Sequence, residues 1–133
     1  MNNEEKELLI IDLSARSSCG VMFQYQTGSF NSTGTSDYFP MVGIVQNAVV
    51  LDIKNRGLFN LSLDDSQCRP YLRPMSSMTE EEWKEYDWFI KQEQDELIRF
   101  RNAVKFYNKH HIDYNDLIPN GLALEAPKGM YNF

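Results

Sequence analysis

The sequence has few cysteines and no long apolar run. Cys19 and Cys68 are its only cysteines, too few for a disulfide-stapled scaffold. No apolar stretch approaches the roughly 20 residues that a membrane-spanning helix needs. Residues 1–7 are polar and largely acidic, so we expect no signal peptide. These absences argue against a disulfide-rich or membrane protein and favour a soluble protein of the cytoplasm.

Basic charge is also scarce. Thirteen basic residues stand against 19 acidic ones, which gives a net charge of −6 and a pI near 4.8. A surface built to hold phosphate backbones has the opposite balance, so the charge disfavours nucleic acid as a partner. The chain has no glycine-rich phosphate loop, no serine nucleophile elbow and no zinc-ligand spacing. We therefore predict a non-enzymatic protein with no catalytic residue, no metal and no cofactor.

The composition that remains is that of a globular protein. Hydrophobic residues make up 42% of the 133 positions, aromatic residues 13% and charged residues 24%. This length fits one domain over residues 1–133. Residues 1–75 are mainly β in pattern, and residues 76–133 form a helical part with a tail, so the predicted fold class is α+β.

The N-terminal half is predicted as a short helix followed by strands. Residues 4–14 fit a helix that starts with glutamates, and a buried strand over 8–11 is the alternative. Apolar alternation and β-branched content predict the strands, and polar or glycine-containing turns separate them. The strands are expected at 21–25, 38–45, 48–53 and 58–63, with turns at 27–29, 46–47 and 55–57, and residues 30–35 are either a weak strand or a loop. Four or five such strands predict a small curled antiparallel sheet or an SH3-like barrel, and a short strand at 71–73 follows them.

A long C-terminal amphipathic helix is predicted over residues 79–109. Thr79 and Glu82 form a capping box at its start, acidic residues follow, and basic residues gather at its end. An apolar stripe interrupted only by Glu93 runs along it, so the segment is one helix, or two helices broken near 92–95. A short last helix capped by Asp113 is expected next, and an apolar tail over 121–133 is expected to pack on the body.

The partner-binding residues are predicted on this helix. Its aromatic face is wider than one stripe needs, which indicates contacts on two sides. We predict a protein partner or self-association, including a homodimer, and no membrane binding. The predicted binding residues are Trp83, Trp88, Phe89, Arg99, Arg101 and Lys105.

Two other hypotheses have weaker support. A nucleic-acid-associated accessory protein would use the basic helix end together with sheet aromatics such as Tyr38, Phe59 and Tyr71. A small hydrolase or a metal site would use Cys19 or the adjacent pair His110 and His111, although neighbouring helical residues point about 100° apart and rarely share a metal.

Several segments resemble a group of small uncharacterised proteins of Bacteroides-type gut bacteria, their phages and their mobile elements. The similar segments are 12–16 with Gly20 and Val21, 68–82, 110–114 with 117–118, and 121–127. The likeness is densest after Cys68, and residues 17–19 depart from it because a bulkier, proline-containing turn is expected there. The resemblance implies a phage or mobile-element origin and a cytoplasmic setting, and it implies no activity, cofactor or catalytic residue.

Overall fold

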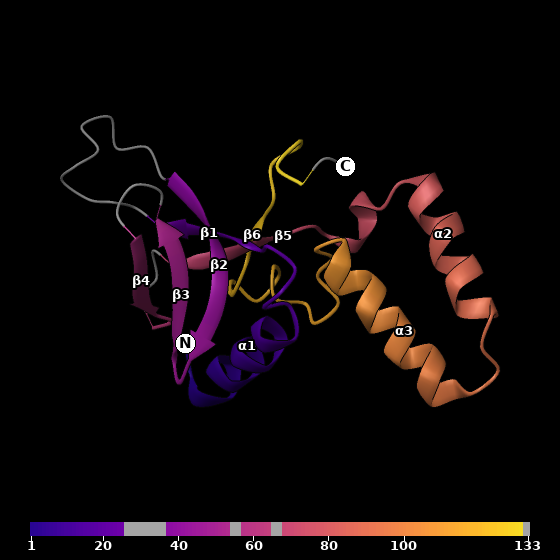
Figure 1. The fold of residues 1–133 in the computed structure, drawn as a ribbon, viewed down its shortest axis with the longest axis horizontal. Coiled ribbons are helices and arrows are strands. Elements are labelled where there is room, and N and C mark those ends of the chain that lie inside the picture. The colour runs from indigo at the N-terminus through magenta and orange to yellow at the C-terminus, as the bar shows by residue number, and fades with distance from the viewer. Residues whose placement is uncertain (26–36, 54–56, 65–67, 132–133) are drawn as a thin grey trace.

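The structure is a computed structural model that describes residues 1–25, 37–53, 57–64 and 68–131. It has the predicted α+β class, with a sheet beside helix α1 and a helical hairpin that extends away from the sheet (Figure 1). The predicted turn at 27–29, the weak strand or loop at 30–35, and the turn at 55–57 apart from Gly57 lie outside the described residues. The helices are α1 (Asn3–Ala15), α2 (Glu80–Lys91) and α3 (Glu96–Lys109). The strands are β1 (Met22–Tyr25), β2 (Asp37–Val45), β3 (Ala48–Ile53), β4 (Gly57–Ser62), β5 (Arg69–Leu72) and β6 (Leu124–Glu125).

The described strands form one open sheet in the order β4-β3-β2-β1-β5-β6. All neighbours are antiparallel except β5 and β6, which are parallel, so the sheet is mixed. The SH3-like barrel is therefore not formed, because β4 and β6 lie at opposite edges of the sheet. The prediction of a purely antiparallel sheet was also wrong, because the tail contributes β6, which pairs in parallel with β5. Local sequence patterns do not reveal this pairing.

The predicted helix and strands of the N-terminal half are confirmed. Helix α1 starts at a capping box, in which the side chain of Asn2 accepts the backbone N–H of Glu5. Strands β2 and β3 meet at the predicted turn, where Gln46 has a φ of 55°. The pairing register shifts between Met41 and Gly43, where a glycine inside the strand favours a bulge.

One hydrophobic core covers a single face of the sheet. Alternate residues of β3 point into it, and α1 and the segment after α3 cover it. Burial of this face is the main stabilising contribution to the body of the molecule. The core residues include Leu9, Leu13, Val21, Phe23, Val49, Leu51, Leu72, Leu117 and Leu122.

The prediction of a single long helix over 79–109 was wrong, because the structure has two antiparallel helices, α2 and α3, in this segment. The break between them lies at 92–95, as the alternative prediction of two helices placed it. The break has a local cause. Asp95 accepts the backbone N–H groups of Leu97 and Ile98, which caps a new helix start in the middle of the segment. The chain therefore turns back, and α2 and α3 lie side by side as the hairpin.

The segment after α3 has the predicted cap but lacks the predicted helix. Asp113 accepts the N–H groups of Leu117 and Ile118, yet residues 112–123 hold an isolated bridge from Ile112 to Arg73, irregular backbone and turns. The tail packs on the body as expected, with Ala126 buried. Tyr131 fastens it, because its hydroxyl donates to the carbonyl of Tyr71 at 2.7 Å and accepts the N–H of Met22 at 2.8 Å.

Candidate functional site

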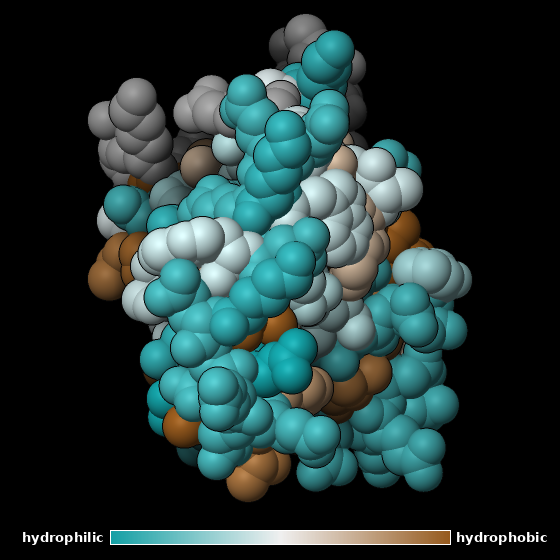
Figure 2. Space-filling view, turned by 90° about the vertical axis from the view of Figure 1, so that its right-hand side faces the viewer, coloured by the Kyte–Doolittle hydropathy of each residue, from teal (hydrophilic) through white to brown (hydrophobic). Residues whose placement is uncertain are grey.

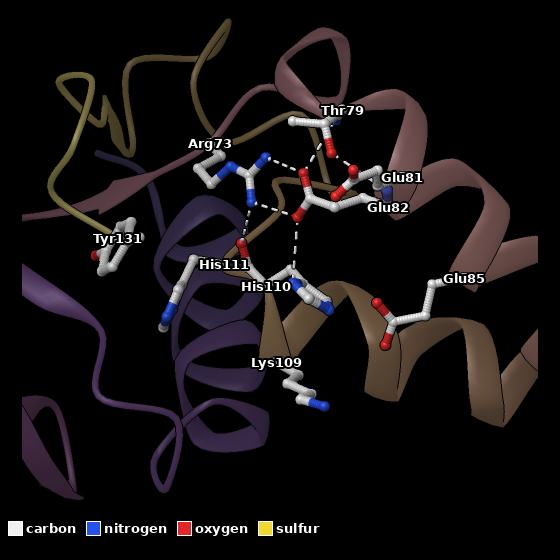
Figure 3. Close-up of a pocket in the computed structure, with 9 residues that line it drawn as sticks. All are labelled: Arg73, Thr79, Glu81, Glu82, Glu85, Lys109, His110, His111 and Tyr131. Atoms are coloured by element: carbon white, nitrogen blue, oxygen red, sulfur yellow. Dashed lines mark hydrogen bonds and ion pairs between the residues drawn. The ribbon is translucent and has the colours of Figure 1, made fainter. Parts of the chain in front are cut away.

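The base of the hairpin is fixed to the body by a group that we call the clamp: Arg73, Glu82 and His110 (Figure 3). Arg73 follows β5, Glu82 lies in the first turn of α2, and His110 ends α3. The Arg73 guanidinium donates two parallel hydrogen bonds to the Glu82 carboxylate, at 2.7 and 2.8 Å. His110 Nδ1 lies 3.2 Å from the same carboxylate. One carboxylate thus joins both ends of the hairpin to the sheet.

Every oxygen of the Glu82 carboxylate is engaged. In addition to Arg73 and His110, the backbone N–H of Thr79 donates to it at 2.9 Å, as part of the predicted capping box. The hydrogen bonds from Arg73 lower the pKa of Glu82 to about 2. A carboxylate that is ionised and saturated with donors is a poor acid or base, so the clamp is suited to holding the hairpin in place.

A second buried arginine holds the same region from the other side. Arg16, at the end of α1, is paired with Asp12 at 2.7 Å, and both side chains are 0% exposed. Its guanidinium also donates to the carbonyl of Ile112 at 2.7 Å, while Arg73 donates to the carbonyl of His110 at 3.3 Å. Two buried cations therefore bind carbonyls at and just beyond the C-terminal end of α3, where the helix dipole is negative.

Three of the segments that carry the sequence resemblance meet at this place. Segment 12–16 supplies Arg16, segment 68–82 supplies the other arginine and the glutamate of the clamp, and segment 110–114 lies between them. They are far apart in the sequence, and the fold brings them together beneath the hairpin. Their shared position explains these segments by structure alone.

A hollow of about 390 Å³ lies beside the clamp (Figure 3). His111 lines it, stacks on the ring of Tyr131 at 3.9 Å, and has a φ of 61°. Burial, together with the smaller effect of the nearby charges of Arg16, His110 and Arg73, lowers the pKa of His111 to about 4. The histidine is therefore neutral near pH 7.

The hollow holds only part of the set of residues that the hydrolase and metal hypotheses named. Both histidines line it, but neither free cysteine does. His110 Nε2 and His111 Nδ1 are buried without a hydrogen-bond partner among the described residues, so neither nitrogen is open to a substrate. Asp113 is occupied as a cap, and the described ranges contain no group of three or more potential metal-ligating side chains.

The hairpin itself carries an apolar hollow of about 260 Å³, which we call the hairpin groove. Its apolar lining comes from both helices, and one acidic and one basic residue stand at its edge. The lining residues are Tyr86, Ile90, Glu96, Arg99, Phe100 and Ala103. Phe100 is 70% exposed, and Leu97, three residues before it, is 81% exposed. Figure 2 looks onto the end of the molecule that carries the hairpin, where hydrophobic side chains (brown) are visible between hydrophilic ones (teal).

The structure does not bring the six predicted binding residues into one site. Arg99 lines the hairpin groove, and the ring of Trp83 packs edge-on against that of Tyr86 in its wall. Phe89 and Lys105 line a second, smaller hollow of about 100 Å³. Trp88 and Arg101 line neither hollow, and both are exposed.

The most exposed apolar residues of the hairpin, Leu97 and Phe100, were not among the predicted binding residues. They belong to the apolar stripe of the predicted helix, whose contacts were left open between the body and a partner. The signal that could have found them is the Asp95 cap, which starts α3 at this point and so places both residues near the tip of the hairpin.

A scan against protein-family models, a search of curated proteins and a search of solved structures each return no match. The site is therefore interpreted from its own geometry. Among the described residues, no helix has both the length and the apolar character to cross a membrane.

Proposed function

We propose that this chain is a non-enzymatic binding or assembly module whose docking surface is the hairpin groove. One observation carries the proposal: α2 contributes no buried residue, and the hairpin holds Leu97 and Phe100 largely exposed beside a hollow. Exposed apolar strips of this kind mark interaction sites in folded proteins, because they cost free energy in water unless a partner covers them.

The clamp supports this proposal because it fixes the hairpin before binding. The charge pair of Arg73 and Glu82 is nearly buried, and His110 ties the end of α3 to the same carboxylate. A surface that is already ordered loses less conformational entropy when it binds. The exposed end of the hairpin can therefore meet a partner without rearranging at its base.

We also propose a cytoplasmic setting and an origin in a phage or mobile element of a Bacteroides-type bacterium. This part of the proposal rests on the sequence resemblance of segments 68–82 and 110–114. With this origin, the partner is a protein of the bacterium, a protein of the phage, or a second copy of the chain.

Site-specific photo-crosslinking tests the docking surface. A photoreactive phenylalanine analogue at position 100 should form covalent adducts, with purified protein or with an extract of a Bacteroides-type bacterium. The matched control places the analogue at position 88, where the tryptophan is similarly exposed at 63% but lines no hollow. Adducts at position 88 alone, or at neither position, would show that the groove is not a docking surface.

Nucleic-acid binding stays as the alternative hypothesis. Arg99, Arg101 and Lys105 are all exposed on α3, but α2 beside it carries five acidic residues against two basic ones. Acidic neighbours weaken the attraction of phosphate. We expect no binding to single- or double-stranded oligonucleotides at low salt, where phosphate contacts are strongest. Salt-dependent binding that is lost in Arg101→Glu would favour the alternative.

A further inference from the structure

We infer that the hairpin groove binds the hairpin of a second copy of this chain, so that two hairpins form a four-helix bundle about a two-fold axis. The inference rests on the proposed function, since it names the partner of the same groove.

The two helices of the hairpin have equal and opposite net charges. Helix α2 has five acidic and two basic residues, a net charge of −3, and α3 has one acidic and four basic residues, a net charge of +3. Around the axis of the bundle, α2 and α3 of one copy are followed by α2 and α3 of the second copy. Every helix then lies between two helices of opposite charge. The like-charged helices lie on the diagonals, and all neighbours are antiparallel, which also suits their dipoles. The chain is therefore complementary to itself.

The unpaired charges lie along the flanks of the exposed apolar strip. Asp87 follows Trp83 by four residues on α2, and Arg101 follows Leu97 by four residues on α3, so each charge lies on the side of its apolar neighbour. Within the described part of the chain, these two charged side chains make no ion pair. Charges that flank an apolar seam set the pairing of helices in bundles and coiled coils. A second copy would bring the basic flank of its α3 to the acidic flank of α2.

The aromatic residues of α2 divide between two sides of the helix. Trp88 follows Trp83 by five residues, which places it about 140° around the helix axis. The ring of Trp83 packs edge-on against that of Tyr86, which lines the groove, and Trp88 lines neither hollow of the hairpin. Trp88 and Phe100 are similarly exposed, at 63% and 70%, but only Phe100 belongs to the proposed interface.

The first test is the solution mass by light scattering and sedimentation across a dilution series. The wild-type chain should have twice its 15.5 kDa mass and dissociate on dilution. Phe100→Asp should be monomeric and folded, since its side chain is mostly exposed, and Trp88→Asp should remain dimeric. A wild-type chain that is monomeric throughout the series, or equal effects of the two substitutions, would overturn the inference.

The second test uses charge exchange between two versions of the chain. One version carries Arg99→Glu with Arg101→Glu, since Arg99 lines the groove, and the other carries Glu80→Lys with Asp87→Lys. Glu80 precedes Trp83 by three residues, so it lies on the same side of α2 as Asp87. Each alone should dimerise about tenfold more weakly or worse, and an equal mixture should restore a dimer of one copy of each. The control, Glu4→Lys with Glu7→Lys, reverses the same number of exposed charges on α1 and should leave the dimer intact. A mixture that stays monomeric would overturn the inference.

The photo-crosslinking at position 100 separates this inference from the proposed function. An adduct of twice the chain mass from purified protein supports the second copy. A monomeric chain that forms an adduct with a different protein at position 100 keeps the docking surface but overturns the second copy. No adduct at that position would overturn both.

Discussion

The clamp predicts that Glu82→Gln strongly destabilises the fold, although the substitution only exchanges one carboxylate oxygen for an amide NH2 group. The substitution keeps the shape of the side chain and leaves glutamine at a position of the capping box that accepts it. It removes the negative charge that faces Arg73, whose side chain is only 2% exposed. An unpaired buried charge of this kind costs about 3 kcal/mol of unfolding free energy. For a chain of this size, that corresponds to a fall in Tm of about 10 °C.

Urea denaturation followed by circular dichroism measures this effect, and Glu80→Gln provides the matched control. Glu80 is two residues earlier in the same helix, and it pairs with Lys84 at 4.0 Å with both side chains exposed. Removing an exposed pair should change the unfolding free energy by no more than about 0.5 kcal/mol. Equal effects of Glu80→Gln and Glu82→Gln would refute the reasoning, because both carboxylates would then behave as surface charges.

Two further measurements isolate the charge pair. Arg73→Met with Glu82→Gln removes both charges and should recover part of the loss, since no buried charge remains unpaired. The pKa of Glu82 near 2, below its usual value of 4.5, sets the pH dependence. The stability from this carboxylate is fully present above pH 4.5 and is lost as the pH falls toward 2. The difference in unfolding free energy between the wild-type chain and Glu82→Gln should therefore shrink as the pH falls from 4.5 toward 2.

The remaining predictions concern single side chains outside the groove. The pKa of His111 near 4 lies below the unfolded value of 6.5, so unfolding free energy should fall as the pH drops through this window. NMR titration of the two histidines measures this pKa directly, and His111→Asn should flatten the pH dependence. Tyr131→Phe removes two hydrogen bonds and should cost about 1 to 2 kcal/mol in urea denaturation. Asp95→Ala removes the cap of α3 and should cost about 1 kcal/mol by the same assay.

Local patterns were sufficient for most elements of the fold. The β3 strand was predicted at its observed bounds, because β-branched residues alternate there between the core and the other face. The capping box of Thr79 was predicted from four consecutive residues, since it depends only on local spacing. The pairing of β6 with β5 could not be predicted in this way, because it joins residues more than 50 positions apart and only two residues form the strand.

The clamp could not be predicted because its residues have ordinary local roles. Glu82 was correctly predicted in a capping box, and that role gave no sign that Arg73 would use the same carboxylate. Arg73 lies between two prolines, where it looks like part of an exposed connector. Its burial depends on the return of α3 to the body, which places His110 against the carboxylate. Only the tertiary structure supplies that partner.

The break between α2 and α3 decides how the aromatic face is used. A single straight helix over 79–109 would carry its apolar stripe about 45 Å, beyond the reach of a small sheet. The Asp95 cap folds this length back, so that Tyr86 stacks on Tyr107 and each helix covers part of the other. Two helices cannot bury a stripe this wide between them, and Phe100 stays exposed as a result. The same cap that shortens the helix therefore creates the surface that a second hairpin would cover.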